Sequence, residues 1–209
     1  GSGMIGSAMA LDLAKNHDVF LSDNNKKTLA KIQSQNNSIE IQQLDVTNKS
    51  ALSQWIQPAD IVLLAVPGFL GYEALKTIIE TGKHVVDISF SQENVLDLNT
   101  LAKKNNVISI VDAGVAPGIP NYLLGYWNSK IEIKSFEYYV GGLPKNPTPP
   151  FYYKAPFSPI DVIQEYTRPA RMMLDGKLIT RPALSDLETI EFEEVGKLEA
   201  FNTDGLRSI

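Results

Sequence analysis

The chain has 209 residues, of which 44% are hydrophobic and 21% charged, and a formal net charge of −5. This composition is typical of a soluble globular protein and excludes the disordered and fibrous classes. The sequence contains no cysteine, which excludes disulfides, thiolate metal sites and a cysteine nucleophile, so we expect a protein of the cytoplasm.

The patterns of charge and hydropathy reduce the number of partner classes to be considered. Lysine and arginine are scattered along the chain, so there is no basic stripe to neutralise a phosphate backbone, and we expect no nucleic-acid partner. No apolar run reaches the roughly 20 residues that a membrane-spanning helix needs, so no membrane partner is expected. The sequence also has no cluster of metal-ligating residues, and we predict no metal site.

The first half of the chain alternates between helix-like and strand-like stretches. We predict, in order, a helix after Gly6, a strand at 19–21, a helix at 26–33, a strand at 39–44, a helix at 49–56, a strand at 61–66, a helix at 72–80, a strand at 85–88, a helix at 96–104 and a strand at 107–111. The continuous apolar run at 61–66 is typical of a strand buried on both faces of a parallel sheet. The alternation predicts an α/β fold with a Rossmann-like, doubly wound parallel sheet.

The pattern changes near Lys130. Apolar residues predict a long strand at 131–140, and the proline-rich stretch that follows is either a linker or a structured loop. Next come a helix at 160–165, a strand at 177–180 and a hairpin at 189–201 that turns near Gly196. We therefore predict two domains, a Rossmann-like domain at 1–128 and an incomplete second domain at 129–209.

Both ends of the chain are abrupt. It starts at Gly1, on a motif that normally follows a strand, and stops soon after Leu206. We interpret it as a fragment that lacks the first strand of the sheet and the C-terminal part of the second domain. The alternative is that Gly1 and Ser2 are a cloning scar.

The opening residues match the pattern G-x-G-x-x-G through Gly1, Gly3 and Gly6. In a dinucleotide site the first glycine makes a tight turn, the second lets the backbone approach the pyrophosphate, and the third lets helix and strand pack closely. Met4 and Ile5 begin the helix whose N-terminus faces the phosphates. The pattern predicts a dinucleotide site.

An acidic residue specifies the cofactor. Asp23 follows the strand at 19–21, about 20 residues after the motif, where a carboxylate accepts hydrogen bonds from the adenosine ribose hydroxyls. A carboxylate there repels the 2′-phosphate of NADP, and no arginine follows to compensate. NAD is favoured, although Lys26 and Lys27 keep NADP open.

Further cofactor contacts are predicted where later strands end, since ligands of open parallel sheets bind at the carboxyl ends of the strands. Asp45 and Val46 are candidates for the adenine end of the site. Val66 and Pro67 form a candidate turn near the cofactor. For each, a helix cap or an ordinary turn is the alternative.

The run from Asp112 to Asn121 contains two glycines and two prolines, which is more backbone specification than a simple connection needs. It follows the strand at 107–111, which places Asp112, Ala113 and Gly114 beside the nicotinamide. We predict a catalytic role for Asp112. The alternative is that it caps the helix that follows.

These motifs resemble the saccharopine dehydrogenase and lysine dehydrogenase superfamily, through residues 1–6, 112–121 and 139–144. Residues 150–154, 158–171 and 199–208 resemble L-lysine 6-dehydrogenases in particular. The resemblance implies a partial α+β second domain that binds substrate and forms a homodimer in the full-length protein. It also implies NAD-dependent oxidative deamination of the side-chain amine of L-lysine to a semialdehyde, which cyclises.

That chemistry sets a requirement for the site. Hydride leaves the carbon next to nitrogen only if the nitrogen lone pair is free, yet the amine of lysine has a pKa of about 10.4 in water. A low-dielectric pocket or a nearby ammonium lowers that pKa. Tyr152, Tyr153 and Lys154 are our candidates for this wall. The alternative is tyrosines of a core or interface and a solvated lysine.

An amino-acid substrate also carries an α-carboxylate, for which the guanidinium group offers a bidentate partner. Arg168, Arg171 and Arg207 are the candidates, and Arg207 is favoured because the polar turn at Thr203 lies beside it. Glu165 is the candidate partner of the α-ammonium. Arginines on the surface are the alternative.

Two other functions stay open. A saccharopine reductase or carboxynorspermidine-type dehydrogenase acts on a secondary amine with a second carboxylate, which requires a further cationic pocket, and often uses NADP. A regulator that binds NAD without catalysis is the other alternative.

Overall fold

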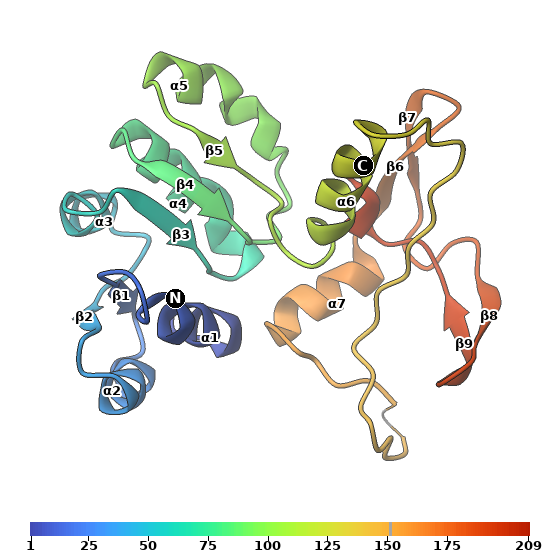
Figure 1. The fold of residues 1–209 in the computed structure, drawn as a ribbon, viewed down its shortest axis with the longest axis horizontal. Helices are drawn as coiled ribbons and strands as arrows, with labels where there is room; N and C mark the ends of the chain where they lie inside the picture. Colours follow the sequence, from blue (N-terminus) through green and yellow to red (C-terminus); the bar gives the residue numbers. More distant parts are fainter. Residues whose placement is uncertain (151) are drawn as a thin grey trace. The chain divides into compact units, whose positions relative to one another are not determined.

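A computed structural model describes residues 1–150 and 152–209. The chain forms two compact units, Gly1–Val111 and Asp112–Ile209, and each is described by itself. The first unit alternates helices and strands (Figure 1). Its elements are α1 (Met4–Leu13), β1 (Phe20–Asp23), α2 (Lys26–Gln35), β2 (Glu40–Gln43), α3 (Lys49–Trp55), β3 (Ile61–Leu64), α4 (Gly68–Glu80), β4 (His84–Asp87), η1 (Val95–Leu98), α5 (Asn99–Lys104) and β5 (Ser109–Ile110).

The strands of the first unit form two parallel sheets, β1–β2 and β3–β4–β5. Leu21 lies opposite Ile41 in the first sheet, and Leu63, Val86 and Ile110 form one row across the second. All the pairings are parallel, and helices connect the strands. The predicted α/β fold with a Rossmann-like parallel sheet is therefore confirmed.

Two apolar clusters hold this unit together. The larger one lies under α4, where Leu75, Ile78 and Ile79 are fully buried because they recur on one face of the helix. The smaller one joins α1 and α2 to the first sheet, around Leu29 and Ile39. Burying a side chain of this size contributes about 1.5–3 kcal/mol, so the two clusters stabilise most of the unit.

One face of the second sheet contradicts the expectation for the run 61–66. Ile61 and Leu63 are exposed, as are Ile108 and Ile110 in the same rows of the sheet. The described helices pack on the opposite face, where Leu64 and Val85 belong to the larger cluster. The prediction of burial on both faces is wrong for the described residues. An apolar run indicates that a strand favours burial, but it does not show whether another element covers each of its faces.

The described residues of the second unit form three helical segments and two hairpins. Its elements are α6 (Ile119–Asn128), α7 (Pro159–Thr167), β6 (Ala170–Leu174), β7 (Lys177–Arg181), β8 (Glu188–Phe192), β9 (Gly196–Ala200) and η2 (Asp204–Leu206). Both hairpins are antiparallel, and Ile190 pairs with Leu198 across the predicted one. Gly196 ends its turn with a φ of +88°, a conformation that favours glycine. The hairpin prediction is confirmed.

The long strand predicted at 131–140 is wrong. These residues run irregularly, and no described strand pairs with them. Alternating apolar residues are not sufficient for a strand, because its backbone N–H and C=O groups need a neighbouring strand. Tyr138 instead donates a hydrogen bond from its hydroxyl to the carbonyl of Gly205, at 3.0 Å.

The division between the units differs from the sequence-based boundary. Residues 112–128 lie in the second unit, although their sequence pattern predicts that they belong to the first. The physical reason is a contact of Asp112, whose carboxylate is paired with Arg207 near the end of the second unit. Among the described residues, no helix is long and apolar enough to cross a membrane.

Candidate functional site

The glycine motif forms a tight turn between β1 and β3. A Cβ placed on Gly1 would lie 2.1 Å from the carbonyl oxygen of Ala65, and one on Gly6 would lie 2.0 Å from the carbonyl oxygen of Gly1. At Gly3 such an atom would meet nothing within 4 Å. Gly1 and Gly6 thus allow two backbone segments to pack more closely than a side chain would permit, while the surface at Gly3 is open.

Helix α1 begins directly on this turn. Its N-cap, Gly3, provides no side-chain hydrogen bond, and the first turn carries no acidic residue. Met4 and Ile5 are exposed there. The first N–H groups of a helix have no partner within the helix and form its positive end. The turn and the helix N-terminus therefore fit the pyrophosphate of a dinucleotide.

Asp23 lies at the carboxyl end of β1 and contacts the glycine turn. Its carboxylate accepts hydrogen bonds from the backbone N–H of Ser2, at 2.5 Å, and of Asn25, at 2.8 Å. Burial opposes ionisation of this carboxyl, but the backbone N–H groups of Ser2 and Asn25, the side chain of Ser2 and the positive charge of the N-terminus together hold its pKa below the usual value. Asp23 is thus an ionised acceptor fixed beside the turn, as the sequence pattern requires.

The other predicted cofactor residues lie farther along the edge of the sheets. The carboxylate of Asp45 accepts hydrogen bonds from the N–H and the hydroxyl of Thr47, at 2.9 and 2.7 Å, and is exposed. Val46 and Val66 pack against the larger apolar cluster. Pro67 is the residue before α4. Asp45 shapes the turn before α3, and its contact with adenine stays a prediction.

Sequence reasoning missed a buried polar group at the carboxyl end of β4. Asp87 is fully buried and accepts hydrogen bonds from the N–H and hydroxyl of Ser89, at 2.8 and 2.5 Å. Ser89 and Ser91 press against Gly71 of α4, where a Cβ would lie 2.2 and 2.4 Å from their hydroxyl oxygens. The sequence did contain a signal for this group, because Asp87 is an acidic residue near the end of a predicted parallel strand.

The turn at Asp112 is a distinctive feature of the second unit. Asp112 is buried and has a φ of +51°, which is uncommon for a residue with a side chain. The guanidinium of Arg207 donates two hydrogen bonds to its carboxylate, one from Nε at 3.1 Å and one from Nη2. Helix α6 has Gly118 as its N-cap, so the alternative that Asp112 caps this helix is wrong.

Ala113 and Gly114 continue the turn. The N–H of Gly114 donates a hydrogen bond to the carbonyl of Pro117, at 3.0 Å, and its own carbonyl accepts one from Ile119. Gly118 packs so closely that a Cβ on it would lie 1.9 Å from the carbonyl oxygen of Gly114. The residues of this run therefore form a tightly constrained turn, as predicted from its glycines and prolines. A contact of these residues with nicotinamide stays a prediction.

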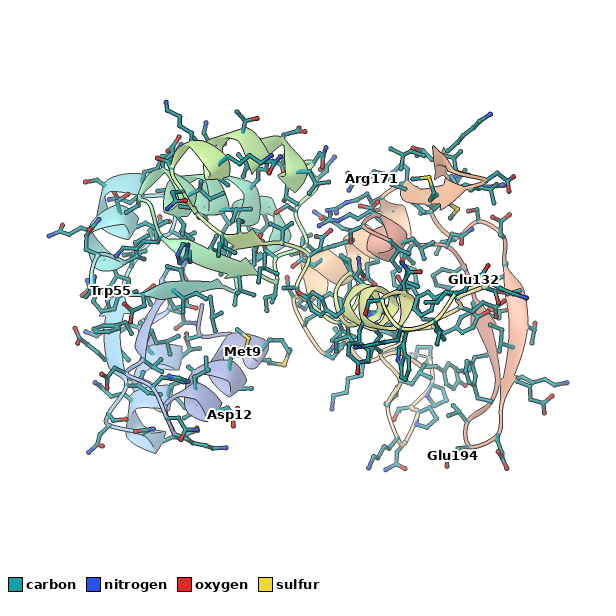
Figure 2. All side chains as sticks on the ribbon, turned by 45° about the horizontal axis from the view of Figure 1, so that its top comes forward. Met9, Asp12, Trp55, Glu132, Arg171 and Glu194 are labelled. Carbon is teal, nitrogen blue, oxygen red and sulfur yellow. The ribbon has the colours of Figure 1, made fainter. Side chains whose placement is uncertain are left out.

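The three candidate arginines converge on Asp204, a residue that the sequence analysis did not select. Its carboxylate is fully buried and accepts hydrogen bonds from Arg171 at 2.9 Å (Nε) and 2.7 Å (Nη2), and from Arg168 at 3.4 Å. Arg207 lies 3.7 Å away. The side chains of Arg168 and Arg207 are only 8% and 5% exposed, against 27% for Arg171. Figure 2 labels Arg171, which belongs to β6.

Glu165 and Tyr166 belong to α7, and Tyr153 lies close to both. Burial, and then the charge of Asp161 one turn earlier on the helix, raises the pKa of Glu165 to about 7. Burial likewise raises the pKa of Tyr153 to about 12. The rings of Tyr153 and Tyr166 meet edge to face, with centroids 6.2 Å apart. A half-buried carboxyl beside tyrosines fits a partner with an ammonium group.

The remaining candidates have simpler surroundings. Lys154 is exposed, and its backbone N–H donates a hydrogen bond to the carbonyl of Gly142, at 2.9 Å. Thr203 precedes η2 and accepts a hydrogen bond from the N–H of Gly205, at 3.3 Å. Tyr152 is also exposed. No group of three or more potential metal ligands occurs in residues 1–150 and 152–209.

Glu165 should make stability depend on pH. Its folded pKa lies near 7, above the ordinary value of 4.5, so deprotonation is less favourable in the folded state than in the unfolded one. The free energy of unfolding should therefore fall as pH rises from about 4.5 to about 7.

Denaturant titrations across this range should show a weaker pH dependence for Glu165→Gln. The same substitution at Glu194, exposed in the turn between β8 and β9 (Figure 2), should keep the wild-type dependence. Identical profiles for wild type and Glu165→Gln would contradict this.

Family models match both units. The model of the saccharopine dehydrogenase NADP binding domain covers residues 1–110, and that of the saccharopine dehydrogenase C-terminal domain covers 114–209. The chain belongs to the saccharopine dehydrogenase family. The family resemblance seen in the sequence is confirmed, whereas the narrower resemblance to lysine dehydrogenases stays a prediction.

Individual relatives agree with this assignment. The chain is 30% identical over 156 residues to the saccharopine dehydrogenase [NADP(+), L-glutamate-forming] of Schizosaccharomyces pombe, with 70% of this chain and 34% of the relative covered. It is 29% identical over 148 residues to alpha-aminoadipic semialdehyde synthase of Arabidopsis thaliana, with 68% and 14% covered.

A solved structure has the same fold. The apo saccharopine dehydrogenase (L-Glu forming) of Saccharomyces cerevisiae matches with a TM-score of 0.69 and 20% identity, over 98% of this chain and 48% of that one. The chain spans about half the length of that protein and at most 34% of the two relatives above. It spans 42% of a third relative, the saccharopine dehydrogenase [NADP(+), L-glutamate-forming] of Saccharomyces cerevisiae, to which it is 27% identical over 189 residues. The nucleotide-binding domain is thus of the nicotinamide-dinucleotide type, and the names of the family model and the fungal relatives specify NADP.

Proposed function

We propose that the full-length protein is an NAD-dependent dehydrogenase that oxidises the side-chain amine of L-lysine. The observation that carries this proposal is the contact between the glycine turn and Asp23, which joins an open phosphate-binding surface to an ionised carboxylate. The choice of lysine rests on the family and on the resemblance in residues 150–154, 158–171 and 199–208. By the same resemblance we propose a homodimer.

Asp23 favours NAD over NADP. Its ionised carboxylate is held by Ser2 and Asn25, and we assign it to the hydroxyl groups of the adenosine ribose, as in other sites of this kind. Hydroxyl groups of an unmodified ribose donate to such a carboxylate, whereas a 2′-phosphate is repelled by it. This preference departs from the NADP in the names of the fungal relatives.

The reaction removes a hydride from the carbon that bears the side-chain amine, and NAD, when bound, accepts that hydride. The imine left on the substrate is hydrolysed by water to ammonia and a semialdehyde, which cyclises. For hydride to leave, the amine must first lose a proton, which a low-dielectric wall or a nearby ammonium promotes. We assign the wall to Tyr153, the ammonium to Lys154, and proton transfer to Asp112.

The rest of the substrate requires polar partners. We assign its α-ammonium to Glu165, a half-buried carboxyl beside two tyrosines. Arg171 is the most accessible of the three arginines and is our first choice for the α-carboxylate. We assign Arg168, Arg207 and Thr203 to the same carboxylate-binding group. Arg168 and Arg207 would support it through Asp204, and Thr203 through the turn that holds Asp204.

A second candidate is the cleavage or formation of saccharopine. It is favoured by the names of the relatives, which are saccharopine dehydrogenases and alpha-aminoadipic semialdehyde synthases. Such a substrate carries a further carboxylate and requires an additional cation at the site. An arginine not already paired with Asp204 or Asp112 would have to supply it.

The deciding experiment is a steady-state assay of the full-length protein. L-lysine with NAD should produce NADH, followed by its absorbance, and NADP should support a lower kcat/KM. Saccharopine with either cofactor is the matched comparison. Turnover of saccharopine without turnover of lysine would contradict the proposed substrate and favour the second candidate.

Replacing Asp23 should change the cofactor preference. Asp23→Asn keeps the size of the side chain but removes its charge, so we expect NADH affinity to fall about tenfold and discrimination against NADPH to shrink. Calorimetric titration with each reduced cofactor measures both effects. Asp18→Asn, at the opposite end of β1 and exposed, should leave both affinities unchanged. An Asp23→Asn protein with unaltered preference for NADH would exclude this role.

A further inference from the structure

Two hydroxyl groups meet beside Asp23. The hydroxyl oxygen of Ser2, in the glycine turn, lies 2.5 Å from that of Thr28, in the first turn of α2. The two residues are 26 positions apart in the chain, and Ser2 is only 3% exposed. This contact joins two segments of the first unit that both bind the carboxylate of Asp23.

Each of these segments holds one oxygen of that carboxylate. The N–H of Ser2 donates to Oδ2, at 2.5 Å, and the N–H of Asn25 donates to Oδ1, at 2.8 Å. Figure 1 shows the start of the chain beside β1, the strand that ends at Asp23. An ionised carboxylate has about four acceptor positions, so further positions remain for the hydroxyl groups of a ribose. The two N–H groups thus set the direction in which Asp23 accepts additional hydrogen bonds.

Thr28 ties the two segments together. Its hydroxyl donates a hydrogen bond to the carbonyl of Asn25, at 2.9 Å, and its N–H donates to Oδ1 of the same residue, at 3.4 Å. The side chain of Ser2, which Thr28 contacts, helps to lower the pKa of Asp23. A hydroxyl as deeply buried as that of Ser2 requires a partner within the protein. Loss of the Thr28 hydroxyl would therefore release the Ser2 side chain next to the carboxylate.

The turn that Thr28 fixes also contains the two lysines that keep NADP open. Lys26 and Lys27 are exposed, and the N–H of Lys27 donates to Oδ1 of Asn25, at 3.0 Å. A lysine ammonium group on its flexible stem binds phosphate as a point charge. A fixed turn with an oriented carboxylate favours an unmodified ribose, whereas a turn that moves gives the lysines access to a 2′-phosphate.

We propose that Thr28 is a positioning residue for cofactor selectivity: through the Ser2 hydroxyl it holds Asp23 in the orientation that accepts hydrogen bonds from an unmodified adenosine ribose. This inference rests on the NAD site proposed above. Thr28 acts through Ser2 and Asp23 and is not assigned a contact with the cofactor. Its loss should therefore change the preference between the two cofactors more than the affinity for the parts that they share.

The test compares Thr28→Val with Thr28→Ser in the full-length protein. Valine keeps the shape of threonine without the hydroxyl, whereas serine keeps the hydroxyl. Calorimetric titrations with NADH and NADPH give the ratio of the two dissociation constants, which measures the discrimination against NADPH. We expect Thr28→Val to reduce this discrimination about three- to tenfold, as for the loss of about one hydrogen bond, and Thr28→Ser to keep it.

The matched control is Ser34→Ala. Ser34 lies at the other end of α2, and its hydroxyl donates to the carbonyl three residues earlier, that of Lys31, at 2.8 Å. Thr28 makes the same kind of bond within the helix but adds the contact with Ser2. Removal of the Ser34 hydroxyl should therefore leave the discrimination at the wild-type value.

A second readout requires no cofactor. Titration of the carboxyl groups by nuclear magnetic resonance gives the pKa of Asp23, which should be higher in Thr28→Val than in wild type or Thr28→Ser, because the ionised form has lost support. In addition, Thr28→Val combined with Asp23→Asn should discriminate no less than Asp23→Asn alone, because Thr28 acts through that carboxylate. Thr28→Ala replaces the valine variant if the latter does not fold.

Three results would overturn the inference. A Thr28→Val protein with either the wild-type discrimination or the wild-type pKa of Asp23 would remove the positioning role, even where Asp23→Asn confirms the cofactor assignment. Equal loss of affinity for both cofactors would make Thr28 a residue of structural importance alone. Wild-type discrimination in Asp23→Asn would instead overturn the cofactor assignment on which the inference rests.

Discussion

Replacing Asp204 by asparagine should lower the free energy of unfolding by about 3–5 kcal/mol, because it leaves buried guanidinium groups without their shared carboxylate. Arg168 and Arg171 both donate hydrogen bonds to Asp204, and Arg207 lies 3.7 Å away. Asparagine keeps the shape of the side chain, so the decrease in the free energy of unfolding reports the removal of the negative charge. Urea unfolding of the full-length protein, followed by circular dichroism, measures it.

The matched control for this substitution is Asp186→Asn. Asp186 also pairs with an arginine, Arg181, but at 3.6 Å and with both side chains at least 41% exposed. Surface ion pairs of this kind contribute about 0–1 kcal/mol, so the control should unfold near the wild-type midpoint. Equal losses in the two variants would contradict the central role of Asp204.

Substitutions in the glycine turn should separate folding from cofactor binding. Gly6→Ala places a Cβ 2.0 Å from a backbone oxygen that cannot move aside easily, and should destabilise the protein by about 1–3 kcal/mol. Gly3→Ala adds its Cβ to open space, so stability should be kept. The same methyl group would occupy the surface that we assign to the pyrophosphate, and NADH affinity should fall about tenfold or more.

Denaturation and calorimetric titration of both variants check these expectations. Gly125→Ala is a suitable control, because this residue lies within α6 and a Cβ there meets nothing within 4 Å. It should bind NADH like the wild type and be slightly more stable, as alanine is a better helix former than glycine. Unchanged NADH affinity in Gly3→Ala would remove the glycine turn from the cofactor site.

Much of the first unit was predictable because its signals are local. Helix α2 begins at Lys26 as expected, since Asn25 caps it by accepting hydrogen bonds from the N–H groups of Lys27 and Thr28. The contact between Asp23 and the glycine turn also followed from a known spacing, because the carboxyl end of a parallel strand brings such residues together.

The second unit was less predictable because its contacts join distant positions. Strand β6 lacks a distinctive pattern, and it forms because β7 provides its hydrogen bonds. Asp204 resembles any acidic residue of a turn until Arg168 and Arg171 are placed around it. The segment 131–140 has the pattern of a strand without a described partner, and so it does not form one.

The sequence by itself determined the parallel α/β fold, the nucleotide-binding turn with Asp23, and the family. These depend on short-range periodicity and on fixed spacings along the chain, which any copy of the fold repeats. Only the tertiary structure decided that the arginines meet at a buried Asp204, that Asp112 pairs with Arg207, and that a hydroxyl of α2 contacts the glycine turn. Burial and charge pairing depend on which residues meet in space, and local sequence patterns do not encode that.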